Sequence, residues 1–174
     1  DNGSLYEYSI EEVPVNGYTT KYGNDASGVA ITFNNQFATE STSYDWVDIY
    51  YILDGTTYKL GRWGGANTSS TSLAGKTIYV PTKDFYLWWR TDGSVNSYYG
   101  FSIDSIIPAE VEHVSTTSTA TLPTGTVKEI SGSTYPESAH SPYANNANKI
   151  WHYTCTDVIY SYSDTPQPGV FKIV

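Results

Sequence analysis

Hydrophobic and polar residues alternate in short runs along this chain, and turn-forming residues separate the runs. Leu5–Val13, Gly28–Phe33 and Trp46–Leu53 are clear examples, each followed by Pro, Asn, Asp or Gly. A period of two residues places neighbouring side chains on opposite faces, so each run predicts a half-buried β-strand. In the third run, one face is expected to carry Val47, Ile49 and Tyr51, and the other Trp46, Asp48 and Tyr50.

Later parts of the chain continue this pattern. The Asp54-Gly55 pair is a strong signal for a two-residue hairpin turn, which would return the chain through residues 58–61. The run Phe85–Arg90 (FYLWWR) is apolar on both faces, which predicts a central strand covered on each side. Further strands are expected at residues 76–80, 100–107, 127–130, 149–156, 158–162 and 170–174.

The composition favours the same fold class. The 174 residues include 17 Tyr and 5 Trp, with many Thr and Ser, and only 16% of the residues are charged. Aromatic and β-branched residues suit pleated, half-buried surfaces, whereas runs of helix-forming Leu, Lys, Ala and Glu are scarce. We therefore expect an all-β fold, an antiparallel β-sandwich of jelly-roll type.

Residues 109–126 are polar and rich in Thr, with Pro108 and Pro123 near their ends. This segment is predicted to be a linker or crossover between a β-sandwich module at 1–108 and further strands at 127–174. The later strands either pack on the first part or begin a second module. Because the strand pattern has already begun at the first residues and is unfinished at the last, we expect a piece of a longer multidomain chain.

Charge and cysteine content narrow the partners and the compartment. A formal net charge of -9, with nine scattered basic residues, disfavours nucleic acid and anionic membranes. No run reaches the roughly 18 apolar residues of a membrane-spanning helix, so no membrane insertion is expected. The single Cys155 cannot form an internal disulfide and is predicted to be a small buried hydrophobe. The composition suits an extracellular bacterial protein, secreted or attached to the cell wall.

Three acidic residues, Glu40, Asp45 and Asp92, lie at turns where predicted strands begin or end. If these turns meet at one rim of the sandwich, the carboxylates converge, and an oxygen-rich site of this kind favours calcium. One alternative is that turn aspartates merely accept local backbone hydrogen bonds. Another is a pair of carboxylates that acts as in a glycosidase.

Other signatures of catalysis are absent from the sequence. His113, His140 and His152 are widely separated and lack the spacing of metal ligands. No GxSxG, HExxH or phosphate-binding loop motif occurs. We therefore expect a protein that is not an enzyme.

Aromatic residues next to loops are the second group of candidate site residues. Trp63, Tyr98 and Tyr99 are candidates for ligand binding, because exposed rings flanked by Asn and Asp can stack on sugars. The alternative for each is a place in the core. Adjacent Trp88 and Trp89 must point to opposite faces of a strand, so at least one is expected to be buried. Trp63, beside a glycine-containing loop, is expected to be exposed.

Part of the chain resembles a known family. Residues 31–103 contain ITFNNQFATE, Tyr-Asp leading into WVDIYY, a Leu-Gly…Gly-Gly turn, and TDGSV followed by Gly-Phe. This combination resembles the later two thirds of a CUB domain, an extracellular β-sandwich. The resemblance implies that Glu40, Asp45 and Asp92 form the acidic triad of calcium-binding CUB domains, although the first two are closer together than usual. It also implies that calcium organises the rim, where a partner's Lys or a polar ligand binds.

The opening signature of that family, Tyr-Pro…Tyr…Asn…Trp, lies after the acidic segment, at residues 133–153. The order is therefore inverted. Either the module is permuted, with residues 127–174 folding beside 28–107, or the end of one module precedes the start of the next. The similarity of GVAITF at 28–33 to GVFKIV at 169–174 favours successive copies.

The first 33 residues resemble a different family. YEYSIEEVPVNGY and the following ITF are similar to the closing hairpin of a Cna-type B repeat of Gram-positive surface proteins. That resemblance implies an internal Lys–Asn isopeptide bond assisted by an acid. Lys172, Asn34 and either Glu11 or Glu12 are the candidates.

Together, these features predict a non-enzymatic extracellular binding or adhesion module of a bacterial surface protein, with calcium at its rim. Its partner is expected to be a host or neighbouring-cell protein or a glycan. A carbohydrate-binding module of a secreted polysaccharide-degrading enzyme and a structural stalk domain are the alternatives.

Overall fold

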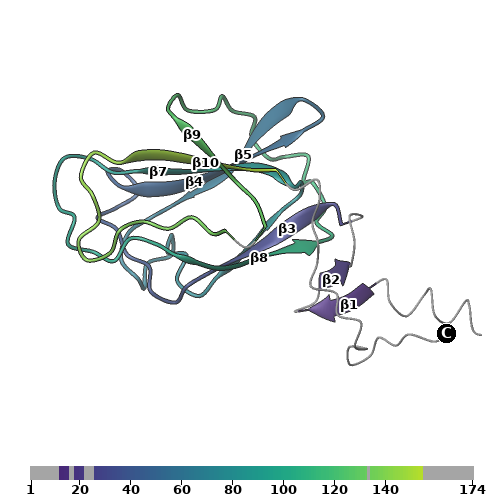
Figure 1. Ribbon diagram of the computed structural model, residues 1–174, viewed down its shortest axis with the longest axis horizontal. Coiled ribbons are helices and arrows are strands. Elements are labelled where there is room, and N and C mark those ends of the chain that lie inside the picture. The colour runs from purple at the N-terminus through teal and green to yellow at the C-terminus, as the bar shows by residue number, and fades with distance from the viewer. Residues whose placement is uncertain (1–11, 16–17, 22–25, 133, 155–174) are drawn as a thin grey trace, which may run out of the picture.

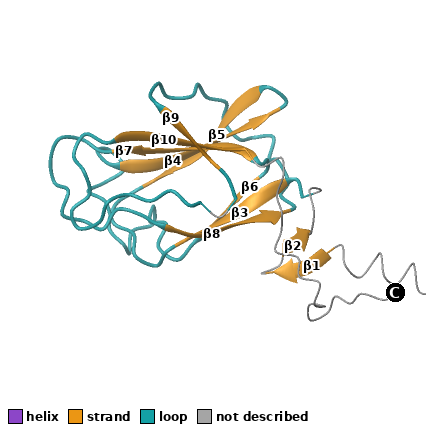
Figure 2. Ribbon diagram, viewed as in Figure 1, coloured by secondary structure: helices purple, strands orange, loops and turns teal. Residues whose placement is uncertain are grey.

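The computed structural model describes residues 12–15, 18–21, 26–132 and 134–154, and every regular element within these ranges is a β-strand (Figures 1 and 2). Most of the strands form two sheets, and a hairpin of β1 (Glu12–Val15) and β2 (Tyr18–Lys21) forms a third. These ranges contain no helix long and apolar enough to cross a membrane. The predicted all-β sandwich is confirmed, whereas its jelly-roll type stays a prediction.

The larger sheet has five strands in the order β5-β4-β7-β10-β9. Neighbouring strands are antiparallel, except that β9 is parallel to β10. Residues 127–154 thus extend the same sheet as residues 46–90. The strands are β4 (Trp46–Leu53), β5 (Thr56–Trp63), β7 (Asp84–Arg90), β9 (Val127–Ile130) and β10 (Asn148–Thr154).

The smaller sheet is antiparallel and has the order β6-β3-β8, with β3 (Gly28–Phe33), β6 (Thr77–Val80) and β8 (Ile103–Ala109). β8 begins later than predicted and runs through Pro108, which the sequence placed after the strand. Proline has no N–H to donate, and β8 can contain it because this strand lies at the edge of the sheet.

The turn between β4 and β5 shows how local chemistry sets the strand pairing. Asp54 and Gly55 have φ angles of 50° and 80°, which are the signs required by a type I′ turn. This turn aligns Leu53 with Thr56 and starts the antiparallel pairing. The hairpin predicted from the Asp-Gly pair is confirmed.

The core lies between the two sheets and is built from the inward faces of the strands. Val47, Ile49 and Tyr51 of β4 point into it and are each 0% exposed, which confirms the predicted face of this strand. Phe85, Leu87 and Trp89 of β7 and Val29, Ile31 and Phe33 of β3 belong to the same cluster.

Strand β7 is central in its sheet, but it is not covered equally on both faces. Its burial alternates, with Trp89 1% exposed and Tyr86 and Trp88 half-buried on the outer face. The prediction of a strand covered on each side is therefore wrong for the outer face. Large aromatic rings can remain half-buried there because they pack against one another and against cationic side chains.

The segment between β8 and β9 is a crossover from one sheet to the other. It first follows the edge of β5, where the backbone of Lys59 donates to Ser118 and that of Ala120 donates to Thr57, at 2.8 and 3.0 Å. It then reaches the outer face at the other edge of the sheet, where Gly125 lies against Ile150. Ile150 is only 2% exposed, so the crossover seals part of the outer face.

Asp48 is a buried carboxylate on this outer face, with 0% exposure. The guanidinium of Arg62 binds it in bidentate fashion, with Nε–Oδ1 and Nη2–Oδ2 distances of 2.8 Å each. Tyr50 donates its hydroxyl hydrogen to Oδ2 at 3.0 Å, and Lys59 Nζ lies 3.3 Å from the same oxygen. A buried charge is tolerated only with such partners, and breaking one is strongly destabilising.

Several sequence predictions fall outside the described residues. These are Cys155, the isopeptide candidates Glu11 and Lys172, the start of the first predicted strand, and the strands predicted at 158–162 and 170–174.

We predict that Asp48→Asn lowers the free energy of unfolding by about 2–4 kcal/mol, because Arg62 and Lys59 lose the carboxylate that neutralises them. Urea denaturation measures this loss. Asp54→Asn is the matched control, since Asp54 lies in an exposed turn with positive φ, where Asn is equally suitable. Equal stability of the two variants would show that the Asp48 pairs contribute little.

Candidate metal centre

Three loops meet at one end of the larger sheet (Figure 1). The strand register places Trp46, Arg90 and Asn148 side by side at that end. The segments 38–45, 91–99 and 135–147, called the rim here, therefore lie together. Hydrogen bonds join them, for example from the backbone N–H of Asn146 to the carbonyl of Asp92, at 2.7 Å.

The rim brings together the three acidic residues predicted from the sequence. One carboxylate oxygen from each of Glu40, Asp45 and Asp92 lies within 4.8 Å of the other two. Glu40 belongs to the loop after β3, Asp45 precedes β4, and Asp92 follows β7. Asp45 and Asp92 converge because β4 and β7 are adjacent and antiparallel, so the start of one meets the end of the other.

Asp45 is fully buried and is held from two sides. Its Oδ1 accepts a hydrogen bond from the backbone N–H of Asp92 at 2.9 Å, and its Oδ2 accepts one from the hydroxyl of Tyr143. Its own carbonyl accepts the hydroxyl hydrogen of Thr39 at 3.0 Å. These bonds fix the carboxylate in a single position.

Tyr143 is a site residue that sequence reasoning missed. It is 1% exposed, its ring packs edge-on against Trp89, and its hydroxyl accepts a hydrogen bond from the backbone N–H of Glu40 at 3.3 Å. Burial and the hydrogen bond to Asp45 raise the pKa of Tyr143, so the hydroxyl stays protonated and remains a donor. The only sequence signal was its place in the Tyr-Pro…Tyr…Asn…Trp segment, which assigned it no role.

The other two carboxylates are less fully satisfied. Asp92 accepts a hydrogen bond at Oδ1 from the backbone N–H of Ser94, 3.1 Å away, as expected of a turn aspartate. Oε2 of Glu40 is buried and has no hydrogen-bond partner in the structure. A local hydrogen bond in the turn therefore explains the position of one oxygen of Asp92. No such bond explains why Oε2 of Glu40 is buried.

The electrostatics of the rim are unbalanced. Within the described ranges, no Lys or Arg forms an ion pair with Glu40, Asp45 or Asp92. Burial raises the pKa of Glu40, and the neighbouring carboxylates of Asp92 and Asp45 raise it further. Converging carboxylates of this kind bind either protons or a cation.

The donor set fits a hard cation. Two oxygens coordinated to one Ca²⁺ at about 2.4 Å can be as much as about 5 Å apart, so the observed spacing is compatible with a single ion. Glu40, Asp45 and Asp92 would each supply one oxygen, and backbone carbonyls or water would complete the shell of six to eight.

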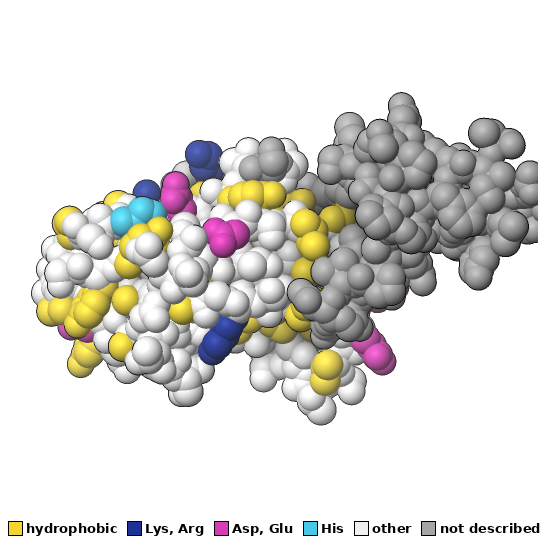
Figure 3. Space-filling model, turned by 90° about the horizontal axis from the view of Figure 1, so that it is seen from below, with side chains coloured by type: hydrophobic (Ala, Val, Ile, Leu, Met, Phe, Trp, Pro, Cys, Tyr) yellow, Lys and Arg dark blue, Asp and Glu magenta, His cyan; other side chains and the backbone are white. Residues whose placement is uncertain are grey.

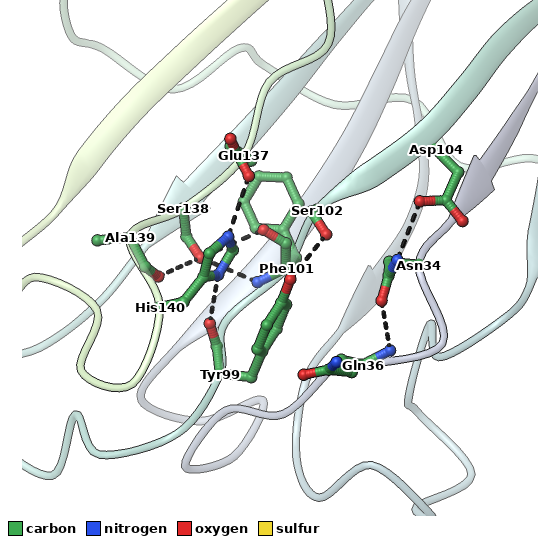
Figure 4. Close-up of polar contacts among 10 residues, drawn as sticks. All are labelled: Asn34, Gln36, Tyr99, Phe101, Ser102, Asp104, Glu137, Ser138, Ala139 and His140. Carbon is green, nitrogen blue, oxygen red and sulfur yellow. Dashed lines mark hydrogen bonds and ion pairs between the residues drawn. The ribbon is translucent and has the colours of Figure 1, made fainter.

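The predicted aromatic residues lie in different surroundings. Trp63 is half-buried, packs against the core and lies over Gly61, so it is less exposed than the sequence predicted. Tyr98 is 37% exposed. Tyr99 is half-buried and stacks on His140 (Figure 4). Their ring centroids are 4.0 Å apart.

The three histidines each have separate partners. His140 lies between the carbonyl of Tyr99 and the carboxylate of Glu137 (Figure 4), and His113 contacts the hydroxyl of Tyr51. His152 lies between Asp84 of β7 and Glu129 of β9. None of the three histidines belongs to the group of potential metal ligands at the rim.

Comparison of the chain with models of protein families, with curated proteins and with solved structures finds no match.

We predict that Glu40→Gln stabilises the metal-free protein at neutral pH. The raised pKa means that folded protein holds a proton on Glu40 more tightly than unfolded protein does. The stability that the folded protein gains by binding this proton is therefore present below the unfolded-state pKa of Glu40. It is lost as the pH rises through the higher folded-state pKa. Thermal unfolding in EDTA as a function of pH measures the effect.

The expected result is that the wild-type melting temperature falls relative to that of Glu40→Gln as the pH rises from about 4 to neutral. Glu112→Gln, at an exposed position on the crossover, is the control and should follow the wild type. A Glu40→Gln variant that is less stable at neutral pH in EDTA would contradict the account of the rim as a site of carboxylate repulsion.

Proposed function

We propose that this chain is a non-enzymatic extracellular binding module whose rim holds a calcium ion and presents it to a partner. Glu40, Asp45 and Asp92 bind the ion, and Tyr143 positions Asp45 from behind. The partner is a host or neighbouring-cell protein or glycan, and it supplies a Lys side chain or another polar group at the rim. The module belongs to a secreted or wall-attached multidomain bacterial protein.

One observation carries the proposal: three carboxylates converge without a cationic side chain among the described residues, and one of their oxygens is buried without a donor. Leaving such groups uncompensated costs free energy, so the arrangement is destabilising by itself. A bound Ca²⁺ converts it into a stabilising one. It also links three loops that come from distant parts of the chain.

The surroundings of the site suit a binding surface. Tyr44, Val95 and Tyr98 are 53%, 49% and 37% exposed, and all three belong to the rim loops. Hydrophobic side chains gather at this end of the molecule when it is seen from below (Figure 3). Exposed apolar groups around a polar centre are typical of interaction sites.

The resemblance to CUB domains supports the proposal if the chain is a single permuted module. The segment 133–153 carries the Tyr-Pro…Tyr…Asn…Trp signature, and its Tyr143 donates to Asp45. β10, from the end of the same segment, pairs with β7. A contact of this kind is what a single permuted module requires, with residues after 127 folding beside 28–107.

We predict that Ca²⁺ stabilises the wild type and that Asp92→Asn removes most of this effect. A ligand bound only by folded protein stabilises it by about 2.7 kcal/mol when its free concentration is one hundred times Kd. For a chain of this size, that corresponds to a rise in melting temperature of roughly 5–11 °C. Calcium titration followed by thermal unfolding, with Mg²⁺ in parallel, measures it.

Asp104→Asn is the matched control, because Asp104 is exposed on β8 and bonds to Asn34 rather than to a rim residue. It should keep the full calcium shift. A wild type whose melting temperature is unchanged by Ca²⁺ would favour the structural stalk, in which the acids have no ligand. Equal shifts in wild type and Asp92→Asn would place the ion elsewhere.

A second candidate function is carbohydrate binding as a module of a secreted polysaccharide-degrading enzyme. The exposure of Tyr98 favours it, and Tyr99 lies next to it as half of a stacked pair. Trp63 supports it less well, because its ring packs on the core.

For this candidate, we expect Tyr98→Ala to weaken glycan binding about tenfold on a glycan array. The reason is that the stacking of a sugar on an aromatic ring contributes on the order of 1 kcal/mol or more. Tyr135→Ala, which removes a half-buried ring packed against the core, controls for general destabilisation. Glycan binding that survives Tyr98→Ala unchanged would remove this residue from the role.

A further inference from the structure

Four large side chains form a patch on the outer face of the larger sheet, next to the rim. Trp46 of β4 pairs with Arg90 of β7, and Asp48 pairs with both Arg62 of β5 and Trp88 of β7. Paired residues share a face, so Trp46, Arg62, Trp88 and Arg90 all point outward. We call these four residues the Arg–Trp patch.

The patch is organised around the indole of Trp46. The guanidinium carbon of Arg62 lies 3.8 Å from the centroid of this ring, and that of Arg90 lies 6.0 Å away. Trp88 meets Trp46 edge to face, with centroids 5.5 Å apart. The indole N–H of Trp88 donates to Asn148 at 2.7 Å. Arg62 is therefore held by this cation–π contact and by its pair with Asp48, whereas Arg90 is exposed and lies at the outer limit of a cation–π contact.

The positive charge of this region exceeds what its own carboxylate neutralises. Arg62 and Lys59 share the single carboxylate of Asp48. Arg90 is exposed, and no carboxylate of the described chain pairs with it. Three cations thus face one anion, in a chain whose net charge is -9.

One hydrogen-bond donor in the patch is unused. Nε1 of Trp46 is buried and has no acceptor in the structure. A buried N–H without an acceptor is destabilising. The free guanidinium of Arg90 lies at the same ring.

We propose that the Arg–Trp patch binds an acidic polysaccharide, through contacts separate from the calcium site. The carboxylate or sulfate groups of the glycan pair with Arg90 and with the unsatisfied cationic charge beside it. The C–H groups of the sugar ring pack on the half-buried indoles of Trp46 and Trp88.

Two observations favour a glycan over an acidic protein segment. Protein interfaces place apolar anchors in their centre. The exposed large hydrophobic residues of the described chain are Tyr44, Val95, Tyr98, Val114 and Val127, and none of them belongs to the patch. The patch instead offers cationic groups and aromatic surface, which match anionic groups and sugar C–H groups.

Affinity electrophoresis of the whole chain in EDTA tests this proposal while no calcium is bound at the rim. The gels contain polygalacturonate, which carries carboxylates, dextran sulfate, which carries sulfates, or neutral dextran. We expect retardation by at least one acidic polymer but not by dextran, and the two acidic gels distinguish carboxylate from sulfate recognition. Arg90→Gln should weaken binding about tenfold, as expected for a lost hydrogen bond to a charged group.

Lys128→Gln is the matched control, because it removes the same charge from an exposed position on β9, away from the patch. Equal loss in Arg90→Gln and Lys128→Gln would overturn the proposal in favour of general charge attraction. Absence of retardation by both acidic polymers, equal retardation by dextran, or tighter binding of poly-L-glutamate would each overturn it as well.

Discussion

The arrangement of the rim depends on the buried carboxylate of Asp45. It accepts hydrogen bonds from the backbone of Asp92 and from the hydroxyl of Tyr143, so one side chain joins all three rim loops. The hydroxyl of Tyr143 also faces the carbonyl of Val95 at 3.3 Å. Val95 has a φ of 56°, a conformation that is costly for a β-branched residue. In this conformation the carbonyl of Val95 faces Tyr143. Removing the Asp45 carboxylate would leave the donors of two loops without their acceptor.

The protein treats its buried carboxylates in two different ways. Asp48 is surrounded by Arg62, Lys59 and the hydroxyl of Tyr50, so the fold itself neutralises the charge. Asp45 receives only neutral donors, and its charged neighbours are two further carboxylates. The same chemical group is thus compensated by cationic side chains on the outer face, whereas no cationic side chain of the described residues compensates it at the rim. This contrast, more than the proximity of three acids, is the physical argument for a metal centre.

Much of the fold could be predicted from the sequence, because strand periodicity and turn chemistry are local. Gly28–Phe33, Trp46–Leu53 and Val127–Ile130 have the predicted bounds, and the Asp-Gly turn has the expected geometry. Asp45 and Asp92 could be expected to meet because they flank the paired ends of β4 and β7, whereas Glu40 lies in the loop between β3 and β4. Tyr143 could not be assigned a role, since its contact with Asp45 spans 98 residues and no periodic pattern marks its loop. The burial of Asp48 was also missed, because its partner Arg62 depends on a register shift between Ile49 and Tyr50.

The two proposed sites are physically linked through the ends of β4 and β7. Asp45 and Trp46 are consecutive residues, and Arg90 precedes Asp92 by two positions, so the pairing of Trp46 with Arg90 fixes residues of both sites. An acidic glycan on the Arg–Trp patch therefore lies close to the carboxylates of the rim. The carboxylates of the rim repel such a ligand, whereas a bound Ca²⁺ brings two positive charges and lowers the repulsion. Because linkage is reciprocal, calcium bound at the rim would raise the affinity of the patch for an acidic glycan, and the glycan would raise the affinity for calcium by the same factor.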